Sequence, residues 1–101
     1  MLESVYEKCF CHELRIRGIP HVAEVPLPIV YRGAHLGCEL FMDIVVDEQL
    51  VIELKTVEML LPIHEAQLLT YLKPSRIRRG LLINFNVSLL KDGLKRLVFG
   101  F

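Results

Sequence analysis

The sequence has few of the features that mark secreted, membrane or modular proteins. It has 3 cysteines, an odd number, and no Cys-x-x-Cys pair, which fits a reducing cytoplasm. No apolar stretch approaches the roughly 20 residues of a membrane span, and no signal-peptide pattern opens the chain. Repeats, linkers and low-complexity segments are also lacking. We therefore expect a cytoplasmic protein with no membrane partner.

The composition is that of one globular domain. The chain has 101 residues, of which 52% are hydrophobic and 24% are charged, so residues 1–101 can build one core. The net charge is zero but unevenly distributed: residues 1–54 hold 4 Lys/Arg against 9 Asp/Glu, and residues 55–101 hold 8 against 3. This polarity is compatible with an acidic metal centre beside a basic rim that faces phosphate, and equally with an ordinary solvated surface.

The hydrophobic pattern and the positions of Pro and Gly predict an alternation of helices and strands. The first half is expected to form a helix over 2–17 ended by Gly18, an extended segment over 21–31, a turn over 32–35, and strands over 40–46 and 50–57. The second half is expected to form a helix from Pro62 to about Lys73 ended by Pro74, and a strand over 79–85. A last helix, capped by Ser88, would carry Leu90, Leu94, Leu97 and Val98. Pro26 and Pro28 indicate an edge or irregular strand. The order α-β-β-β-α-β-α predicts an α/β (α+β-like) fold, in which helices flank a mixed β-sheet.

Charged residues interrupt two of these apolar strands. Asp43 lies within 40–46, and Glu53 and Lys55 lie within 50–57, where Val, Ile and Leu prevail. Charged side chains are rarely buried unless they are paired or bind a metal. We therefore treat these three residues as the first candidates for a functional site.

The register of the hairpin decides whether the two carboxylates meet. Side chains alternate along a strand, so Glu53 and Lys55 share one face. If residues 47–49 form a three-residue loop, Asp43 falls opposite Glu53, with Cβ atoms roughly 5 Å apart. A two-residue loop would instead set Asp43 against Ile52 and turn Glu53 and Lys55 to the other face.

Two carboxylates this close repel each other unless a cation lies between them. Converging carboxylate oxygens suit Mg²⁺, with Mn²⁺ as a substitute, because both ions prefer oxygen ligands. Lys55 would then orient a water molecule or stabilise developing negative charge. The alternative is a structural cluster whose charges neutralise one another, and the spacing alone does not decide between the two.

Two helices carry further polar candidates. In the second expected helix, His64, Gln67 and Tyr71 recur at i, i+3 and i+7 and share a face. Such a face is usually solvated; the functional alternative is that Gln67 and Tyr71 border the strand carboxylates, and for His64 we rank a structural role first. Glu3 lies in the first turn of the first helix, where the helix dipole favours a carboxylate with or without a site.

Taken together, these residues resemble the GxxExxY family, which belongs to the PD-(D/E)XK nuclease superfamily. The resemblance covers nearly the whole chain and rests on residues 2–7 (LESVYE), 25–28 (VPLP), Asp43, 51–55 (VIELK), 61–72 (LPIHEAQLLTYL) and 80–86 (GLLINFN). Two positions depart from the pattern. The Gly of the family's name motif would precede Met1, and Met42 stands where the superfamily's label has Pro.

The resemblance implies a restriction-endonuclease-like core and a role for each matching residue. Asp43 and Glu53 would be metal ligands, with the Leu54 backbone carbonyl as a further ligand. Lys55 would be the catalytic lysine. Three residues would support the site and the substrate: Glu3 of the name motif, and Gln67 and Tyr71 of a Gln-x-x-x-Tyr pattern.

The function that the resemblance implies is a Mg²⁺-dependent nuclease that hydrolyses phosphodiester bonds of nucleic acid, preferably DNA. The alternative is a catalytically inactive nuclease-fold module for binding nucleic acid or protein, since 101 residues leave no separate domain to grip a duplex and the net charge is zero. A homodimer that completes the substrate-binding surface is a third reading. Binding of Mn²⁺ through the two strand carboxylates would separate the first reading from the second.

Overall fold

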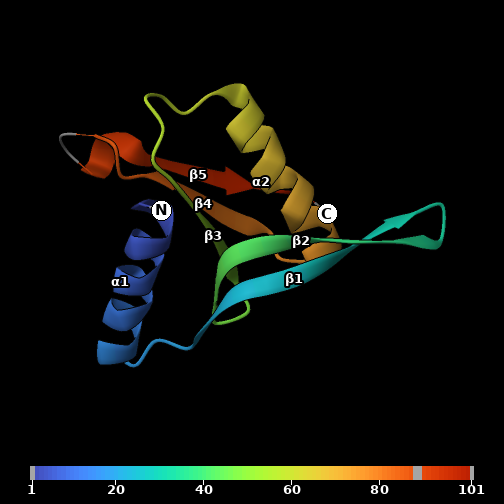
Figure 1. Cartoon of the computed structure of the whole chain (residues 1–101), viewed down its shortest axis with the longest axis horizontal. Helices are drawn as coiled ribbons and strands as arrows, with labels where there is room; N and C mark the ends of the chain where they lie inside the picture. Colours follow the sequence, from blue (N-terminus) through green and yellow to red (C-terminus); the bar gives the residue numbers. More distant parts are fainter. Residues whose placement is uncertain (1, 88–89, 101) are drawn as a thin grey trace.

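The chain forms one mixed sheet with a helix on each face (Figure 1). The computed structural model describes residues 2–87 and 90–100. Its elements are α1 (Leu2–Ile16), β1 (His21–Tyr31), β2 (Ala34–Val46), β3 (Leu50–Lys55), α2 (Pro62–Ser75), β4 (Arg79–Asn84), a 3-10 turn η1 (Leu90–Gly93) and β5 (Leu94–Val98). The strands follow the order β1-β2-β3-β4-β5, and β3 and β4 pair in parallel while the other neighbours are antiparallel. The predicted α+β class with a mixed sheet is confirmed.

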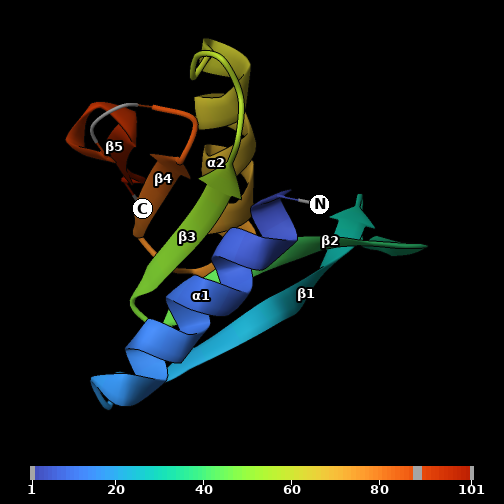
Figure 2. The same ribbon diagram turned by 60° about the vertical axis from the view of Figure 1, so that its left-hand side comes forward.

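The two helices cover opposite faces of the sheet (Figure 2). Alternation along β3 divides its side chains between two cores. One core joins α1 to the sheet through Cys11, Leu14, Ile44, Ile52, Leu54 and Ile83. The other joins α2 to the sheet through Leu27, Met42, Val45, Val51, Leu68, Tyr71, Leu72 and Leu82. Glu53 and Lys55 alternate with Ile52 and Leu54, so they point to the α2 side of β3.

The three-residue loop between β2 and β3 is confirmed. Val46 pairs with Leu50, and the ladder ends two pairs later at Ile44 and Ile52. Beyond this point β2 leaves β3 and continues with β1 as a long two-stranded arm (Figure 1). The sheet therefore forks immediately beside Asp43 and Glu53.

β1 is an edge strand with an irregular ladder, as its prolines predict. Val30 faces His35, so a regular ladder would set Pro28 opposite residue 37, but Pro28 faces Glu39. The turn at the end of the arm is shorter than predicted, because Arg32 and Gly33 have φ of 50° and 80° and β2 begins at the next residue. Positive φ at both central residues is the geometry of a tight hairpin turn.

The predicted last helix is wrong. Leu94–Val98 is strand β5, paired with β4, and helical geometry is limited to the 3-10 turn Leu90–Gly93; Ser88 lies outside the described residues. The spacing of the apolar residues suits a helix, but it also suits a strand in which Leu97 and Phe99 pack against the α2 core. The exposed edge of β4 offers backbone partners that a helix would leave unpaired. The order is therefore α-β-β-β-α-β-β, with a short 3-10 turn before the last strand.

Several predicted element bounds also shift. β2 begins at Ala34 rather than at residue 40, α1 ends at Ile16 rather than at residue 17, and β4 ends at Asn84 rather than at residue 85. α2 continues through Pro74 to Ser75 and ends where Arg76 adopts φ 63°. β3 ends at Lys55 rather than at residue 57, because the Asn84 side chain holds the backbone of Val57. None of the described helices is both long and apolar enough to cross a membrane.

Candidate active site at the fork of the sheet

Side chains replace backbone pairing where β2 and β3 separate. The Leu54 backbone N–H donates to Asp43 Oδ2 at 2.8 Å, and the Asp43 N–H donates to Glu53 Oε1 at 3.2 Å. Each carboxylate therefore takes a hydrogen bond that a regular ladder would give to a carbonyl. The predicted pair meets, and it lies in the gap between the two diverging strands.

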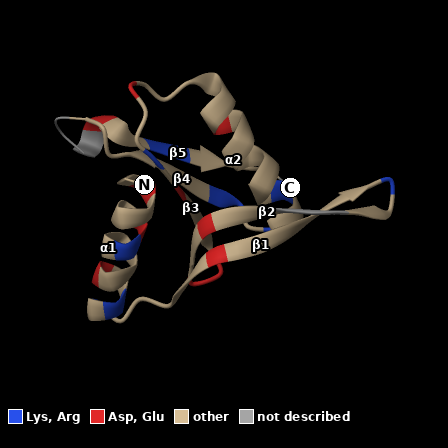
Figure 3. Ribbon diagram, viewed as in Figure 1, with Lys and Arg blue, Asp and Glu red and all other residues tan. Residues whose placement is uncertain are grey.

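Two further carboxylates join Asp43 from α1 and β1. Carboxylate oxygens of Glu7, Glu24 and Asp43 all lie within 4.8 Å of one another. The acidic segments of β1 and β2 lie side by side at the base of the arm (Figure 3). Together with Glu53, these residues bring one carboxylate from each of α1, β1, β2 and β3 to the fork, and we call them the carboxylate cluster.

Glu24 holds a backbone conformation that is rare for its residue type. Its φ is 53°, in the left-handed region that costs a residue with a Cβ roughly 1–2 kcal/mol. Its neighbours Ala23 and Val25 pair with Ile44 and Met42, so Glu24 sits across from Asp43 in the ladder. Strained backbone tends to persist where the surrounding structure requires it, often at functional sites.

The cluster holds protons more tightly than isolated carboxylates would. Burial, followed by the charge of Asp43, raises the pKa of Glu53 to about 8. Burial and the neighbouring Glu24 raise the pKa of Glu7 to about 7. The pKa of Asp43 is raised as well, chiefly by burial, although the hydrogen bond from Leu54 opposes the shift. The protein surroundings therefore disfavour the charged forms of these carboxylates.

Lys55 connects the cluster to α2. Its Nζ donates to Gln67 Oε1 at 3.4 Å, and Gln67 Nε2 donates to the Tyr71 hydroxyl oxygen at 3.1 Å. Tyr71 is 5% exposed, and burial followed by the charge of Glu53 raises its pKa. The structure thus brings together the lysine and the two α2 residues that the sequence placed on one helix face.

Glu3 and His64 lie beside this arrangement rather than within the carboxylate cluster. Thr56 Oγ1 donates to Glu3 Oε2 at 3.4 Å, so Glu3 contacts the end of β3 one helical turn away from Glu7. The Leu61 backbone N–H donates to His64 Nδ1 at 2.9 Å. His64 therefore caps the start of α2, the structural role ranked first from the sequence.

A buried amide fixes the chain that follows Lys55. Asn84 is 2% exposed; its Oδ1 accepts from the Val57 N–H at 3.1 Å and its Nδ2 donates to the Val57 carbonyl at 2.8 Å. Nearby, the rings of Tyr6 and Phe85 stack at 4.3 Å and join α1 to the end of β4. These contacts limit the freedom of the backbone on both sides of the cluster.

The donor set suits a hard divalent cation. The cluster offers carboxylate oxygens, the ligands that Mg²⁺ and Mn²⁺ prefer. Burial, followed by the neighbouring carboxylates, raises the pKa values of Glu7, Asp43 and Glu53, and a cation among them would favour their charged forms. The residues present therefore fit a metal site of the kind that the sequence predicted.

Comparison with models of known protein families places this chain in a superfamily. Residues 1–97 match the model of the PD-(D/E)XK nuclease superfamily. The chain belongs to this superfamily. No curated protein and no solved structure matches the chain. In the superfamily's label an acidic residue and a lysine stand two positions apart, as Glu53 and Lys55 do in this chain.

Two residues of the cluster, Glu7 and Glu24, were not found from the sequence. Glu7 follows Glu3 at i+4, so both lie on one side of α1, and this spacing was an available signal. Glu24 gave no such signal, because its position across from Asp43 depends on the irregular ladder of the arm.

Proposed function

We propose that this protein is a GxxExxY-family nuclease that uses Mg²⁺ or Mn²⁺ to hydrolyse phosphodiester bonds in DNA. The observation that supports this most directly is the meeting of carboxylates from α1, β1, β2 and β3 next to Lys55, in a chain of the PD-(D/E)XK nuclease superfamily. A purely structural cluster would favour charges that balance, whereas this one holds more carboxylates than cations.

In this proposal the metal ligands are Asp43 and Glu53, with the Leu54 backbone carbonyl. Glu7 reaches Asp43 from α1 and would complete or orient the ligand set. A bound divalent ion would polarise the phosphate and lower the pKa of a water molecule. Ionisation of Glu53 and Glu7, whose pKa values are raised to about 8 and about 7, would accompany ion binding.

The positively charged ammonium of Lys55 is suited to interact with the reacting phosphate. Its positive charge opposes the rise in the pKa of both strand carboxylates, although burial outweighs it. Gln67, itself held by Tyr71, fixes the ammonium. We assign Lys55 to orient the attacking water and to stabilise charge that develops on the phosphate oxygens. Glu3 would support the end of β3 through Thr56.

The test is cleavage of a 5′-labelled DNA oligonucleotide in Mg²⁺ or Mn²⁺, with an RNA of the same sequence in parallel. We expect wild-type protein to cut DNA, and Glu53→Gln and Lys55→Met to lower the rate by about 100-fold or more. Lys73→Met is the matched control, because Lys73 is exposed on the last turn of α2. No cleavage in either ion, or equal cleavage by both site variants, would refute the proposal. Mn²⁺ binding without cleavage would favour an inactive binding module.

A further inference from the structure

A groove runs from the carboxylate cluster along the open edge of the sheet. It encloses about 450 Å³ between α1 and the start of β1, and Glu7 lines it. Because Glu7 also belongs to the carboxylate cluster, the groove and the cluster share this residue and lie next to each other. Among the described strands, β1 has a neighbour on one side alone, so the groove lies between a helix and an edge strand.

The walls of the groove carry positive charge at a spacing that suits phosphate. Lys8 and Arg15 line it from α1, and residues 21–23 of β1 form the opposite wall. From Glu7 to Arg15 the helix advances about 12 Å. Phosphates of one B-form strand follow every 3.4 Å or so along the axis, so this length accommodates at least two of them.

Apart from Glu7, Lys8 and Arg15, the residues that line the groove are apolar or neutral. Cys11 is 6% exposed, and burial followed by the charge of Glu7 raises the pKa of its thiol. His21 Nδ1 donates to the Ile19 carbonyl at 2.9 Å, which leaves its other ring nitrogen as a hydrogen-bond acceptor in the neutral form. A base or sugar could therefore lie against apolar and neutral polar groups while its phosphate meets the cationic rim.

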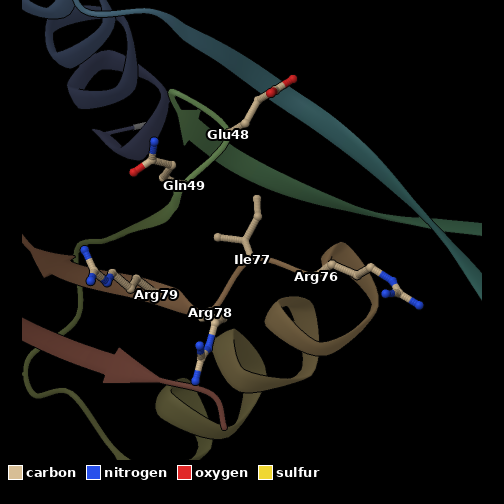
Figure 4. Close-up of a pocket in the computed structure, with 6 residues that line it drawn as sticks. All are labelled: Glu48, Gln49, Arg76, Ile77, Arg78 and Arg79. Carbon is tan, nitrogen blue, oxygen red and sulfur yellow. The ribbon is translucent and has the colours of Figure 1, made fainter. Parts of the chain in front are cut away.

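A second cavity, of about 300 Å³, is richer in arginine but differs in geometry. It lies between the β2–β3 loop and the α2–β4 connection and is lined by Glu48, Gln49, Arg76, Ile77, Arg78 and Arg79. Its three guanidinium groups point in different directions (Figure 4). They do not converge on one anion, and no residue of this cavity belongs to the carboxylate cluster.

We propose that the groove between α1 and β1 holds a single strand of the nucleic-acid substrate, with Lys8 and Arg15 paired to phosphates next to the one that is cut. This inference rests on the proposed nuclease function. A volume of about 450 Å³ is that of a site for one small ligand, too small to enclose a base pair together with the backbones of both strands. The groove therefore admits a separated strand or a frayed end and leaves an intact duplex outside.

The binding test compares wild-type protein with the Lys8→Glu/Arg15→Glu double variant and with Lys73→Glu as the control for charge. Fluorescence anisotropy would follow a labelled single strand and its blunt duplex in Ca²⁺ over a range of salt. We expect wild type and the control to prefer the single strand, and the double variant to bind it at least tenfold more weakly. Each lost phosphate contact lowers the salt slope by about 0.7 for a single strand, so we expect a decrease of about 1.4.

Both substituted residues are exposed, so folding should survive, and circular dichroism checks this. If the double variant fails to fold, Lys8→Gln and Arg15→Gln replace it. Equal single-strand affinity in wild type and the groove variants, or a wild-type preference for duplex, would overturn the inference.

Kinetics separate this inference from the proposed function. If the protein cuts DNA, the Lys8→Glu/Arg15→Glu substitutions should raise KM and leave kcat unchanged. An unchanged KM would refute the inference about the groove without affecting the nuclease function. If wild type cuts neither DNA nor RNA but the groove variant loses single-strand binding, the nuclease function fails and the groove remains a binding site.

Discussion

Replacing Glu53 by Gln tests whether the carboxylate cluster strains the metal-free protein. The side chain is 5% exposed, and burial followed by the charge of Asp43 raises its pKa from 4.5 to about 8. Between these two pH values the folded protein keeps a proton that the unfolded chain has released. Stability therefore falls as the pH rises from about 4.5 to about 8, because the folded state binds more protons than the unfolded state.

The size of the effect follows from the shift. One pKa unit corresponds to about 1.4 kcal/mol, so the shift of Glu53 corresponds to a loss of up to roughly 4 kcal/mol at pH 8. Gln has no proton to release in this range and can still accept the Asp43 N–H through its carbonyl oxygen. We expect Glu53→Gln to match wild type near pH 4.5 and to be more stable by about 2–4 kcal/mol at pH 8 in EDTA.

The assay is urea unfolding followed by circular dichroism at both pH values. Glu58→Gln, at an exposed position in the loop after β3, controls for the loss of one carboxylate. Adding Mg²⁺ at about 100 times its Kd should stabilise wild type by about 2.7 kcal/mol and the Glu53→Gln variant by less. A stability difference that does not change with pH, or a wild type that is more stable than Glu53→Gln at pH 8 in EDTA, would refute the reasoning.

Three further substitutions test separate contacts. Glu7→Gln should weaken Mn²⁺ binding about tenfold or more, as measured by titration calorimetry. Glu3→Gln, whose carboxylate lies outside the cluster, should weaken Mn²⁺ binding less. A larger loss of affinity in Glu3→Gln than in Glu7→Gln would contradict the geometry. Asn84→Ala should lower the free energy of unfolding by about 2–3 kcal/mol, because it leaves buried backbone groups without partners, and an unchanged melting temperature would exclude that role. Gly80→Ala would place a Cβ 2.8 Å from Leu68 Cδ2 and should cost about 1–3 kcal/mol; thermal unfolding should show partial recovery when Leu68→Val is added, and no recovery would mean that the strain lies elsewhere.

The parts of the fold that local chemistry determines were predicted from the sequence. A polar loop between two apolar runs fixed the β2–β3 register, and the prolines of β1 marked an irregular edge strand. The end of the chain was not predictable in the same way. The apolar spacing over 94–98 fits a helix and a strand alike, and the free edge of β4, a tertiary feature, selects the strand.

The residues of the candidate site also differ in whether a local sequence pattern reveals them. Asp43, Glu53 and Lys55 were found because charged residues stand out in apolar strands. Gln67 and Tyr71 were found because helical spacing puts them on one face. Glu24 reaches the cluster only through the shifted ladder of the arm and its own positive φ. A local pattern carries no record of such a shift, since pairing between distant strands decides it.

The hydrogen bonds at the fork make two acidic residues part of the sheet. Asp43 accepts from Leu54 and Glu53 accepts from Asp43, so a substitution that removes the accepting oxygen leaves a backbone N–H without a partner, at a cost of about 1–3 kcal/mol. A lineage that no longer needed the chemistry would still be selected to keep a hydrogen-bond acceptor at both positions, although Gln could replace Glu53. The hydrogen bond of the Lys55 side chain goes to the Gln67 side chain and not to the backbone. Among descendants of this protein that lost the function, we therefore expect position 55 to vary freely and positions 43 and 53 to vary only among side chains that accept a hydrogen bond.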